Sequence, residues 1–201
     1  AVAHFEAAVA LDPDFVEGWV ELAGARHLLG WLAGPRVAEL AREAAERALE
    51  LNAESSKAYR VLGDVSWFHD ADFLRAGEHR ERAVQLNPND PGTLNGYAAT
   101  LNFQGRDPEM RNTIERLIRI APLDSFYRGL AVKNFVYGRF YELAASELEK
   151  QRKLWPGVTR SDEWLLFSKL DRHEDSFRGW MGIHTQIGRD PQHRATLEKI
   201  S

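Results

Sequence analysis

One helix–turn–helix segment of 34 residues, 91–124, recurs along this chain and limits what the chain can fold into. Asp90 and Pro91 open it, because aspartate accepts hydrogen bonds from the free N–H groups of a helix start and proline has no N–H to lose. Apolar residues then recur at helical spacing as far as Gly105, and a second apolar run ends at Pro122. The flanking segments repeat this pattern, which predicts an array of helical pairs.

The repeats divide the chain into an array and a tail. We expect the array over residues 1–157, with half a repeat at 1–13 and full repeats at about 16–55, 56–90, 91–124 and 124–157. A proline closes four of these helical runs, at Pro13, Pro88, Pro122 and Pro156. Residues 158–201 keep the pattern only weakly. They are predicted to form a degenerate fifth repeat plus a C-terminal capping helix, since the terminal units of solenoids are atypical.

Two repeats depart from the regular spacing between their helices. Gly30 is expected to end the first helix of the repeat at 16–55, so that residues 31–37 form an insertion before the second helix. The segment His69–Phe73 is one residue longer than the standard turn of the following repeat. Both departures predict longer connections at these two places.

Composition excludes several classes of function. The net charge of −4 lacks the basic footprint that nucleic-acid binding needs, so we expect no direct nucleic-acid partner. The chain has no cysteine, which excludes disulfides and thiolate metal sites. No apolar run approaches the ~20 residues needed to cross a bilayer, so no membrane segment is predicted.

The sequence also lacks the motifs of common active sites. Neither a glycine-rich phosphate loop nor a GxSxG nucleophile motif is present, and we predict no enzyme activity, no catalytic residue and no cofactor. One cluster has metal-ligand residue types, namely His69, Asp70, Asp72 and His79. Its spacing does not match a known metal motif, and the two aspartates fit turn and cap roles better. No metal site is predicted.

The repeated residues resemble the tetratricopeptide repeat (TPR) superfamily. Each first helix carries two bulky residues and a small one, such as Leu94, Tyr97 and Ala98, and the second helix ends near a proline. The resemblance implies an all-α fold, a right-handed α-solenoid of helix–turn–helix repeats. The stretch 34–90 is also similar to TPR regions of bacterial signalling proteins, which accompany winged-helix regulators, class III adenylate cyclases and serine/threonine kinases.

The resemblance further implies a non-catalytic scaffold that binds a peptide or helix in a concave groove lined by the first helices. We therefore predict that eight residues contact a protein partner: Arg60, Asp64, Trp67, Asn95, Asn102, Phe103, Arg128 and Phe135. The lysine and asparagine pattern of the carboxylate clamp in chaperone-binding TPR domains is absent from the corresponding positions.

Each group of these residues has a structural alternative. Arg60, Asn95 and Arg128 are assigned to equivalent places and would form a polar ladder for a peptide, because guanidinium groups bind carboxylates in a bidentate manner. Alternatively, the arginines are solvated and paired within their repeats. The aromatic residues would be anchors for the partner, or else they pack between adjacent repeats.

Two further functions are left open at this point. The chain could self-associate through exposed solenoid ends, which would bury Phe5, or it could position substrates in a larger enzyme. The missing initiator methionine and the half repeat lead us to expect a segment of a longer protein. The excess of arginine over lysine is typical of GC-rich bacterial sources, and we expect a cytoplasmic location.

Overall fold

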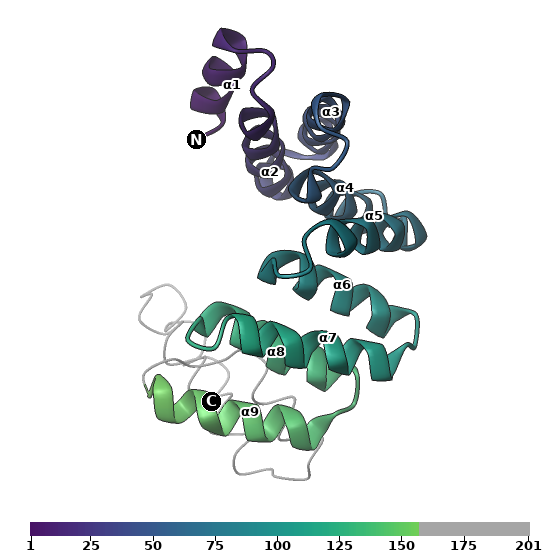
Figure 1. Ribbon diagram of the computed structural model, residues 1–201, viewed down its shortest axis with the longest axis vertical. Helices are drawn as coiled ribbons and strands as arrows, with labels where there is room; N and C mark the ends of the chain where they lie inside the picture. The colour runs from purple at the N-terminus through teal and green to yellow at the C-terminus, as the bar shows by residue number, and fades with distance from the viewer. Residues whose placement is uncertain (157–201) are drawn as a thin grey trace, which may run out of the picture. The chain divides into compact units, whose positions relative to one another are not determined.

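The computed structural model describes residues 1–156, with the backbone alone for residues 31–33. Within that range the chain forms nine α-helices and no strand (Figure 1). The helices are α1 (Val2–Leu11), α2 (Val16–Ala33), α3 (Pro35–Leu51), α4 (Ser56–Phe68), α5 (Phe73–Leu86), α6 (Pro91–Phe103), α7 (Asp107–Ile120), α8 (Ser125–Tyr137) and α9 (Tyr141–Leu154). This bears out the predicted all-α fold. The predicted degenerate repeat at 158–201 lies outside the described residues.

The chain divides into two compact units, Ala1–Ile120 with α1 to α7 and Ala121–Ser201 with α8 and α9. In the first unit, helices pack in the pairs α2–α3, α4–α5 and α6–α7 (Figure 1). Helix α4 also contacts α2 and α3, and α6 contacts α4 and α5. The first helices of successive repeats therefore lie next to one another. In the second unit α8 packs on α9. The proposed repeat boundaries stay a prediction.

The turns within three repeats share a left-handed residue at intervals of 34 residues: Ala71 (φ 54°), Gly105 (φ 69°) and Arg139 (φ 63°). Only the middle one is glycine, the residue that adopts this conformation without steric cost. Gly105 follows the end of α6, as the sequence predicts. The turn at residues 69–72 is one residue longer than the turn at 104–106, which confirms the expected lengthening there.

The first repeat absorbs its extra residues by lengthening both helices. Helix α2 continues through Gly30 to Ala33, and α3 begins at Pro35, so Gly34 (φ 88°) alone connects them. The prediction that Gly30 ends a helix and that 31–37 is an insertion is therefore wrong. A glycine within a helix costs only about 1 kcal/mol. Here a Cβ on Gly30 would lie 3.1 Å from Cε1 of His69, so the glycine permits close packing.

Side-chain caps set the start of several helices. Asp90 accepts a hydrogen bond from the Thr93 N–H at 2.7 Å, as the sequence predicts for α6. Ser55 caps α4 through the Ala58 N–H, and Asp124 caps α8 through the N–H groups of the two residues Phe126 and Tyr127. These caps give α4, α6 and α8 a common origin from which equivalent positions can be counted, and Phe15 is the corresponding residue before α2.

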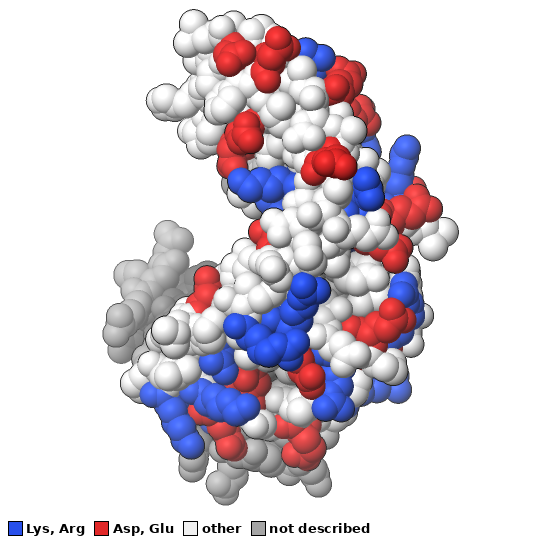
Figure 2. Space-filling model, viewed as in Figure 1, with Lys and Arg blue, Asp and Glu red and all other residues white. Residues whose placement is uncertain are grey.

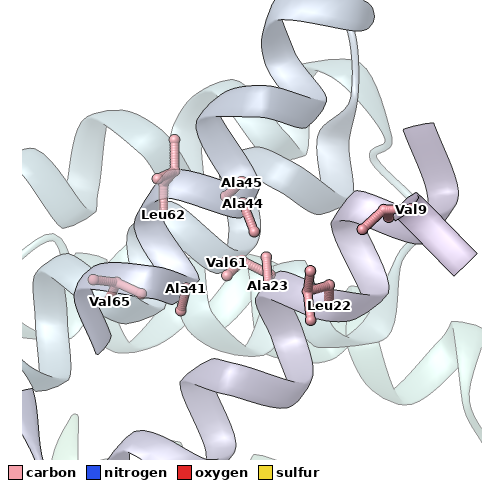
Figure 3. Packing of buried hydrophobic residues seen from close by; sticks show 9 residues of the cluster. All are labelled: Val9, Leu22, Ala23, Ala41, Ala44, Ala45, Val61, Leu62 and Val65. Carbon is pink, nitrogen blue, oxygen red and sulfur yellow. The ribbon is translucent and has the colours of Figure 1, made fainter. Parts of the chain in front are cut away.

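The core of the first repeats is built from alanine, valine and leucine side chains (Figure 3). Helix α3 presents an alanine face that lets α2 and α4 approach closely. The buried cluster comprises Val9, Leu22, Ala23, Ala41, Ala44, Ala45, Val61, Leu62 and Val65. This packing holds α2 and α4 side by side. Toward their C-terminal ends His27 of α2 lies next to Phe68 of α4, and the candidate site lies there.

Candidate partner-binding surface

Position 13, counted from the residue that caps each first helix, carries an exposed apolar side chain in four helices. The capping residues are Phe15, Ser55, Asp90 and Asp124. The position-13 residues are Leu28, Phe68, Phe103 and Tyr137, which are 69%, 48%, 60% and 53% exposed. Single exposed apolar residues are common on protein surfaces, but the same place in four consecutive repeats makes a pattern.

In the first unit one of these residues, Phe103, packs against two further aromatic side chains. We call the set Leu28, Trp67, Phe68, Phe73 and Phe103 the apolar band. Trp67 contacts Phe73 with ring centroids 4.8 Å apart and Phe103 at 5.7 Å. Phe73 and Phe103 lie 4.5 Å apart. Steep interplanar angles of 72° and 80° around Trp67 give edge-to-face packing, which stabilises the cluster beyond its buried area.

Two histidines lie next to the apolar band. The ring of His27 is 6.0 Å from Phe68 and 5.3 Å from His69, the latter in edge contact. His27 is buried, and its Nδ1 has no hydrogen-bond partner. Burial lowers the pKa of His27, while the nearby Asp64 carboxylate opposes this shift. The lowered pKa favours the neutral imidazole, which packs against Phe68 of the band.

A buried arginine packs against the band. Arg80 of α5 is only 2% exposed, donates a hydrogen bond to Asp64 Oδ1 at 3.0 Å and another to Thr100 Oγ1 at 3.1 Å. Its guanidinium carbon lies 4.7 Å from the centroid of the Trp67 ring, a cation–π contact. Burial lowers the pKa of Arg80, and Asp64 counteracts this. Arg80 thus connects both first helices, α4 and α6, to the second helix α5.

Two glycines make room for this side chain. A Cβ on Gly63 of α4 would lie 2.7 Å from Arg80 Cγ, and one on Gly96 of α6 would lie 3.1 Å from Arg80 Nε. Any larger residue at either position would compete with the arginine for the same space. Sequence analysis missed the role of Arg80, although the glycines of neighbouring first helices were a signal for it.

The predicted partner-binding residues of the first unit take different places. Trp67 and Phe103 belong to the apolar band. Arg60 forms a 3.6 Å ion pair with Asp64 of the next helical turn, as the structural alternative expects. The two asparagines, Asn95 and Asn102, are half-buried on α6. Asn102 lies beside Phe103, and its side-chain amide makes no hydrogen bond among the described residues.

The predicted residues of the second unit are buried. Arg128, 8% exposed, stands four residues after its cap and so matches Leu94 of α6, one residue before Asn95. It pairs with Glu147 of α9, and its Nη1 also donates to the carbonyl oxygen of Pro122 at 2.8 Å. The proposed equivalence with Arg60 and Asn95 is therefore off by one residue.

Phe135 is also buried, at 3% exposure, and lies 6.5 Å from the ring of Phe140. Counting from the caps, it matches Leu101 of α6, which is fully buried. The exposed aromatic residue of α8 is Tyr137. Partner contact by the eight predicted residues as a set remains a prediction.

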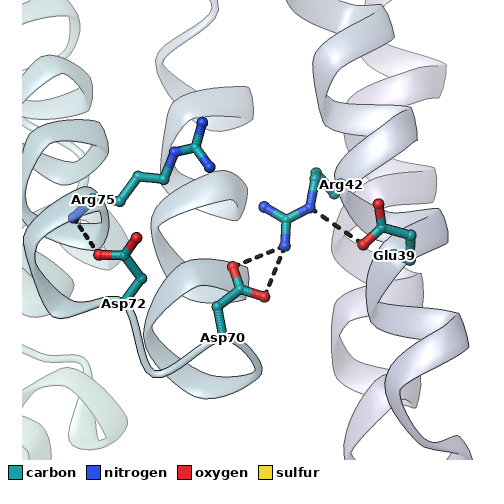
Figure 4. A network of polar contacts seen from close by, with 5 residues as sticks. All are labelled: Glu39, Arg42, Asp70, Asp72 and Arg75. Carbon is teal, nitrogen blue, oxygen red and sulfur yellow. Dashed lines mark hydrogen bonds and ion pairs between the residues drawn. The ribbon is translucent and has the colours of Figure 1, made fainter.

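The turn between α4 and α5 is held by charged groups (Figure 4). One guanidinium nitrogen of Arg42 donates hydrogen bonds at 2.8 Å to both carboxylate oxygens of Asp70. Arg42 also forms an ion pair with Glu39. Asp72 caps α5 through the Arg75 N–H at 3.0 Å. The cap role predicted for Asp72 is confirmed, whereas Asp70 ties the turn to α3. No group of three potential ligands in residues 1–156 is arranged to hold a metal ion.

Charge on the drawn face of the molecule is mixed. Figure 2 shows acidic and basic side chains interspersed with uncharged surface, with no broad area of one sign among the described residues. None of the described helices is both long and apolar enough to cross a membrane.

Known structures share this architecture. YrrB, described as a TPR protein with an unusual peptide-binding site, is 15% identical and has a TM-score of 0.62, with 99% of this chain and 100% of YrrB covered. MamA from Desulfovibrio magneticus RS-1 is 14% identical with a TM-score of 0.63, and 86% of this chain and 97% of that chain are covered. A chain of the APC/C hetero-tetramer Cut9–Hcn1 is 14% identical with a TM-score of 0.75, covering 98% of this chain and 38% of that chain.

These similarities establish the fold as an all-α TPR solenoid. No family model and no curated protein matches the sequence.

Proposed function

We propose that this TPR chain is a protein-interaction module whose first helices bind a peptide segment of a partner, as the regulatory part of a larger bacterial signalling protein. The observation that carries the proposal is the apolar band, in which large apolar side chains stay exposed at the same position of successive first helices. Exposing such side chains to water is unfavourable, and groups of exposed apolar side chains mark interaction sites on soluble proteins.

The surroundings of the band suit a binding surface. Phe103 is the most exposed aromatic member, and it packs against Trp67 and Phe73, so its ring is held in place before a partner arrives. Rigid aromatic anchors lose little conformational entropy on binding, which is why they dominate binding energy at interfaces. YrrB, a similar structure, is described as having a peptide-binding site, which is consistent with this type of function.

The proposal is tested by selecting a peptide that binds the purified chain from a random phage-displayed library. Its affinity is then measured by calorimetry for the wild type and for the double variant Phe68→Ala/Phe103→Ala. We expect the double variant to lose at least ~30-fold in affinity, the equivalent of about 2 kcal/mol. The matched control is Leu11→Ala, an apolar truncation on α1 outside the band at a residue that is 88% exposed.

Two outcomes would count against the proposal. Equal loss in the double variant and in Leu11→Ala would show that the selected peptide merely coats apolar surface. If the chain alone sediments as an oligomer and the double variant sediments as a monomer, a second copy of the chain occupies the band. The regulatory context is tested separately, by determining which domains flank this segment in the full-length protein.

A further inference from the structure

We propose that the partner segment is uncharged and proline-rich, and that it binds in the polyproline II conformation over Trp67 and Phe103. This inference rests on the proposed function and names the chemistry of its partner. Four properties of the band lead to this inference: its packed aromatic rings, its unused hydrogen-bond donors, the balance of the charges near it, and the spacing between its position-13 side chains.

The packed aromatic rings are the first property. Trp67, Phe73 and Phe103 lie with ring centroids 4.5 to 5.7 Å apart and at steep angles around Trp67. Aromatic surfaces bind the pyrrolidine rings of proline, whose polyproline II helix is preformed and therefore loses little entropy on binding. Arg80 stacks on Trp67 and is itself fixed by Asp64, which holds the indole in place.

Unused donors are the second property. Trp67 and Asn102 are both only half-buried, and neither the indole N–H of Trp67 nor the amide of Asn102 makes a hydrogen bond among the described residues. A polyproline II segment has no internal hydrogen bonds, so its carbonyl oxygens remain available as acceptors. A helical segment would satisfy its own backbone and leave these donors without a partner.

Charge is the third property. Several cations on the helices and turns of the band have carboxylate partners within the chain: Arg60–Asp64 at 3.6 Å, Arg42–Asp70 at 2.8 Å and Lys57–Glu21 at 3.4 Å. Arg106, which follows α6, pairs with Glu109. On α5, Arg75 and Arg82 have no carboxylate partner among the described residues, and the two acidic residues Glu78 and Glu81 of the same helix match them in number. The charges near the band therefore balance, and an uncharged peptide complements it better.

Spacing is the fourth property. Packed helices lie about 8–10 Å apart, so position 13 of one first helix is separated from the next by about that distance. Polyproline II rises about 3.1 Å per residue with three residues per turn, so every third residue faces the same side about 9 Å further along. Successive prolines on one face can therefore contact Phe68 and then Phe103.

The test uses the whole chain and three blocked peptides: an oligoproline long enough to span two position-13 side chains, a glycine–serine peptide of equal length, and a helical peptide with leucine at heptad spacing. The indole N–H signals are followed by ¹⁵N NMR, with Trp67 assigned from Trp67→Phe. We expect saturable binding of oligoproline alone, a shift of the Trp67 signal, and an affinity that salt does not change.

Variants separate specific binding from surface adhesion. Trp67→Phe keeps a ring but removes the N–H donor, and we expect roughly tenfold weaker binding of oligoproline. Phe103→Ala should weaken binding to a similar or greater extent, roughly tenfold or more, and Leu11→Ala should leave it unchanged. Circular dichroism of each variant confirms that the helices are intact.

The remaining outcomes overturn the inference. Oligoproline binding that survives both Trp67→Phe and Phe103→Ala would place the peptide elsewhere. If only the heptad peptide binds and Phe103→Ala weakens it, the partner is a helix, and the proposed function stands without this inference. If none of the peptides binds while a library-selected peptide does, the proline-rich partner is refuted and the proposed function survives.

Discussion

Arg80 is an almost fully buried cation whose guanidinium donates to Asp64 Oδ1 at 3.0 Å, across the boundary between two helices of one repeat. The same side chain reaches Thr100 in the next repeat and supports Trp67 in the apolar band. It therefore links the stability of the array to the geometry of the proposed binding surface.

Replacing Arg80 should destabilise the chain strongly. Arg80→Ala removes the nearer of the two cationic partners of Asp64 and the packing of the aliphatic stem, so we expect the free energy of unfolding to fall by about 3–5 kcal/mol. Arg80→Met keeps part of the stem and should lose less. Urea denaturation measures both, and exposed Arg82→Ala on the same helix is the control, expected within about 0.5 kcal/mol of wild type. Equal midpoints for Arg80→Ala and Arg82→Ala would contradict the structural role.

Glycine should be the better residue at two of the three left-handed turn positions. Ala71 (φ 54°) and Arg139 (φ 63°) adopt a conformation that costs a residue with a side chain about 1–2 kcal/mol. Because glycine also gains entropy in the unfolded chain, we expect Ala71→Gly and Arg139→Gly to stabilise by about 0.5–1 kcal/mol net. Gly105→Ala should destabilise. Thermal unfolding measures all three, and a lower melting temperature for both glycine variants would refute the assignment.

The stability of the first unit should fall in mild acid. Burial lowers the pKa of His27 and of His79 below 6.5, so between that value and the lower folded-state pKa the unfolded chain binds more protons than the folded chain. The free energy of unfolding should therefore decrease as the pH falls below about 6.5. His27→Phe should reduce this slope while leaving the helical content at neutral pH unchanged. An identical pH profile for the variant would show that His27 does not contribute.

The buried ion pair in the second unit should be sensitive to single changes and tolerant of a paired one. Glu147→Ala leaves Arg128 as an uncompensated buried charge, and we expect a loss of about 3–5 kcal/mol in local stability. The apolar double variant Arg128→Met/Glu147→Met should recover most of this loss, because Leu94 fills the same place in α6. Hydrogen exchange of α8 and α9 amides reports the local stability. A double variant as unstable as the single one would contradict this account.

Much of the fold follows from local sequence signals. Asp90 and Gly105 bound α6 as predicted, because capping and left-handed turns depend on a few consecutive residues. The prediction for Gly30 failed for a related reason. A glycine is as compatible with close helix contact as with a helix end, and only the His69 ring packed against it distinguishes the two.

The surface was less predictable than the fold. Trp67 and Phe103 were predicted as partner contacts and lie in the apolar band, but the row formed by position 13 became visible only with the helix caps in place. A helix turns by about 100° per residue, so an alignment error of one residue moves a side chain from solvent to the core. Arg128 is an example: the sequence alignment assigned it to a polar ladder, but counted from its helix cap it takes the buried position of Leu94.

The sequence by itself determined the repeat, the helical class and most helix boundaries, since these depend on apolar periodicity and on capping residues close in the chain. Only the tertiary structure decided which polar residues are buried and which aromatic residues stay exposed. The burial of Arg80 depends on the space left by Gly63 and Gly96 on two other helices. Such long-range complementarity has no local signature, so the exposed ring of Phe103 and the apolar band around it emerged only when the helices were packed together.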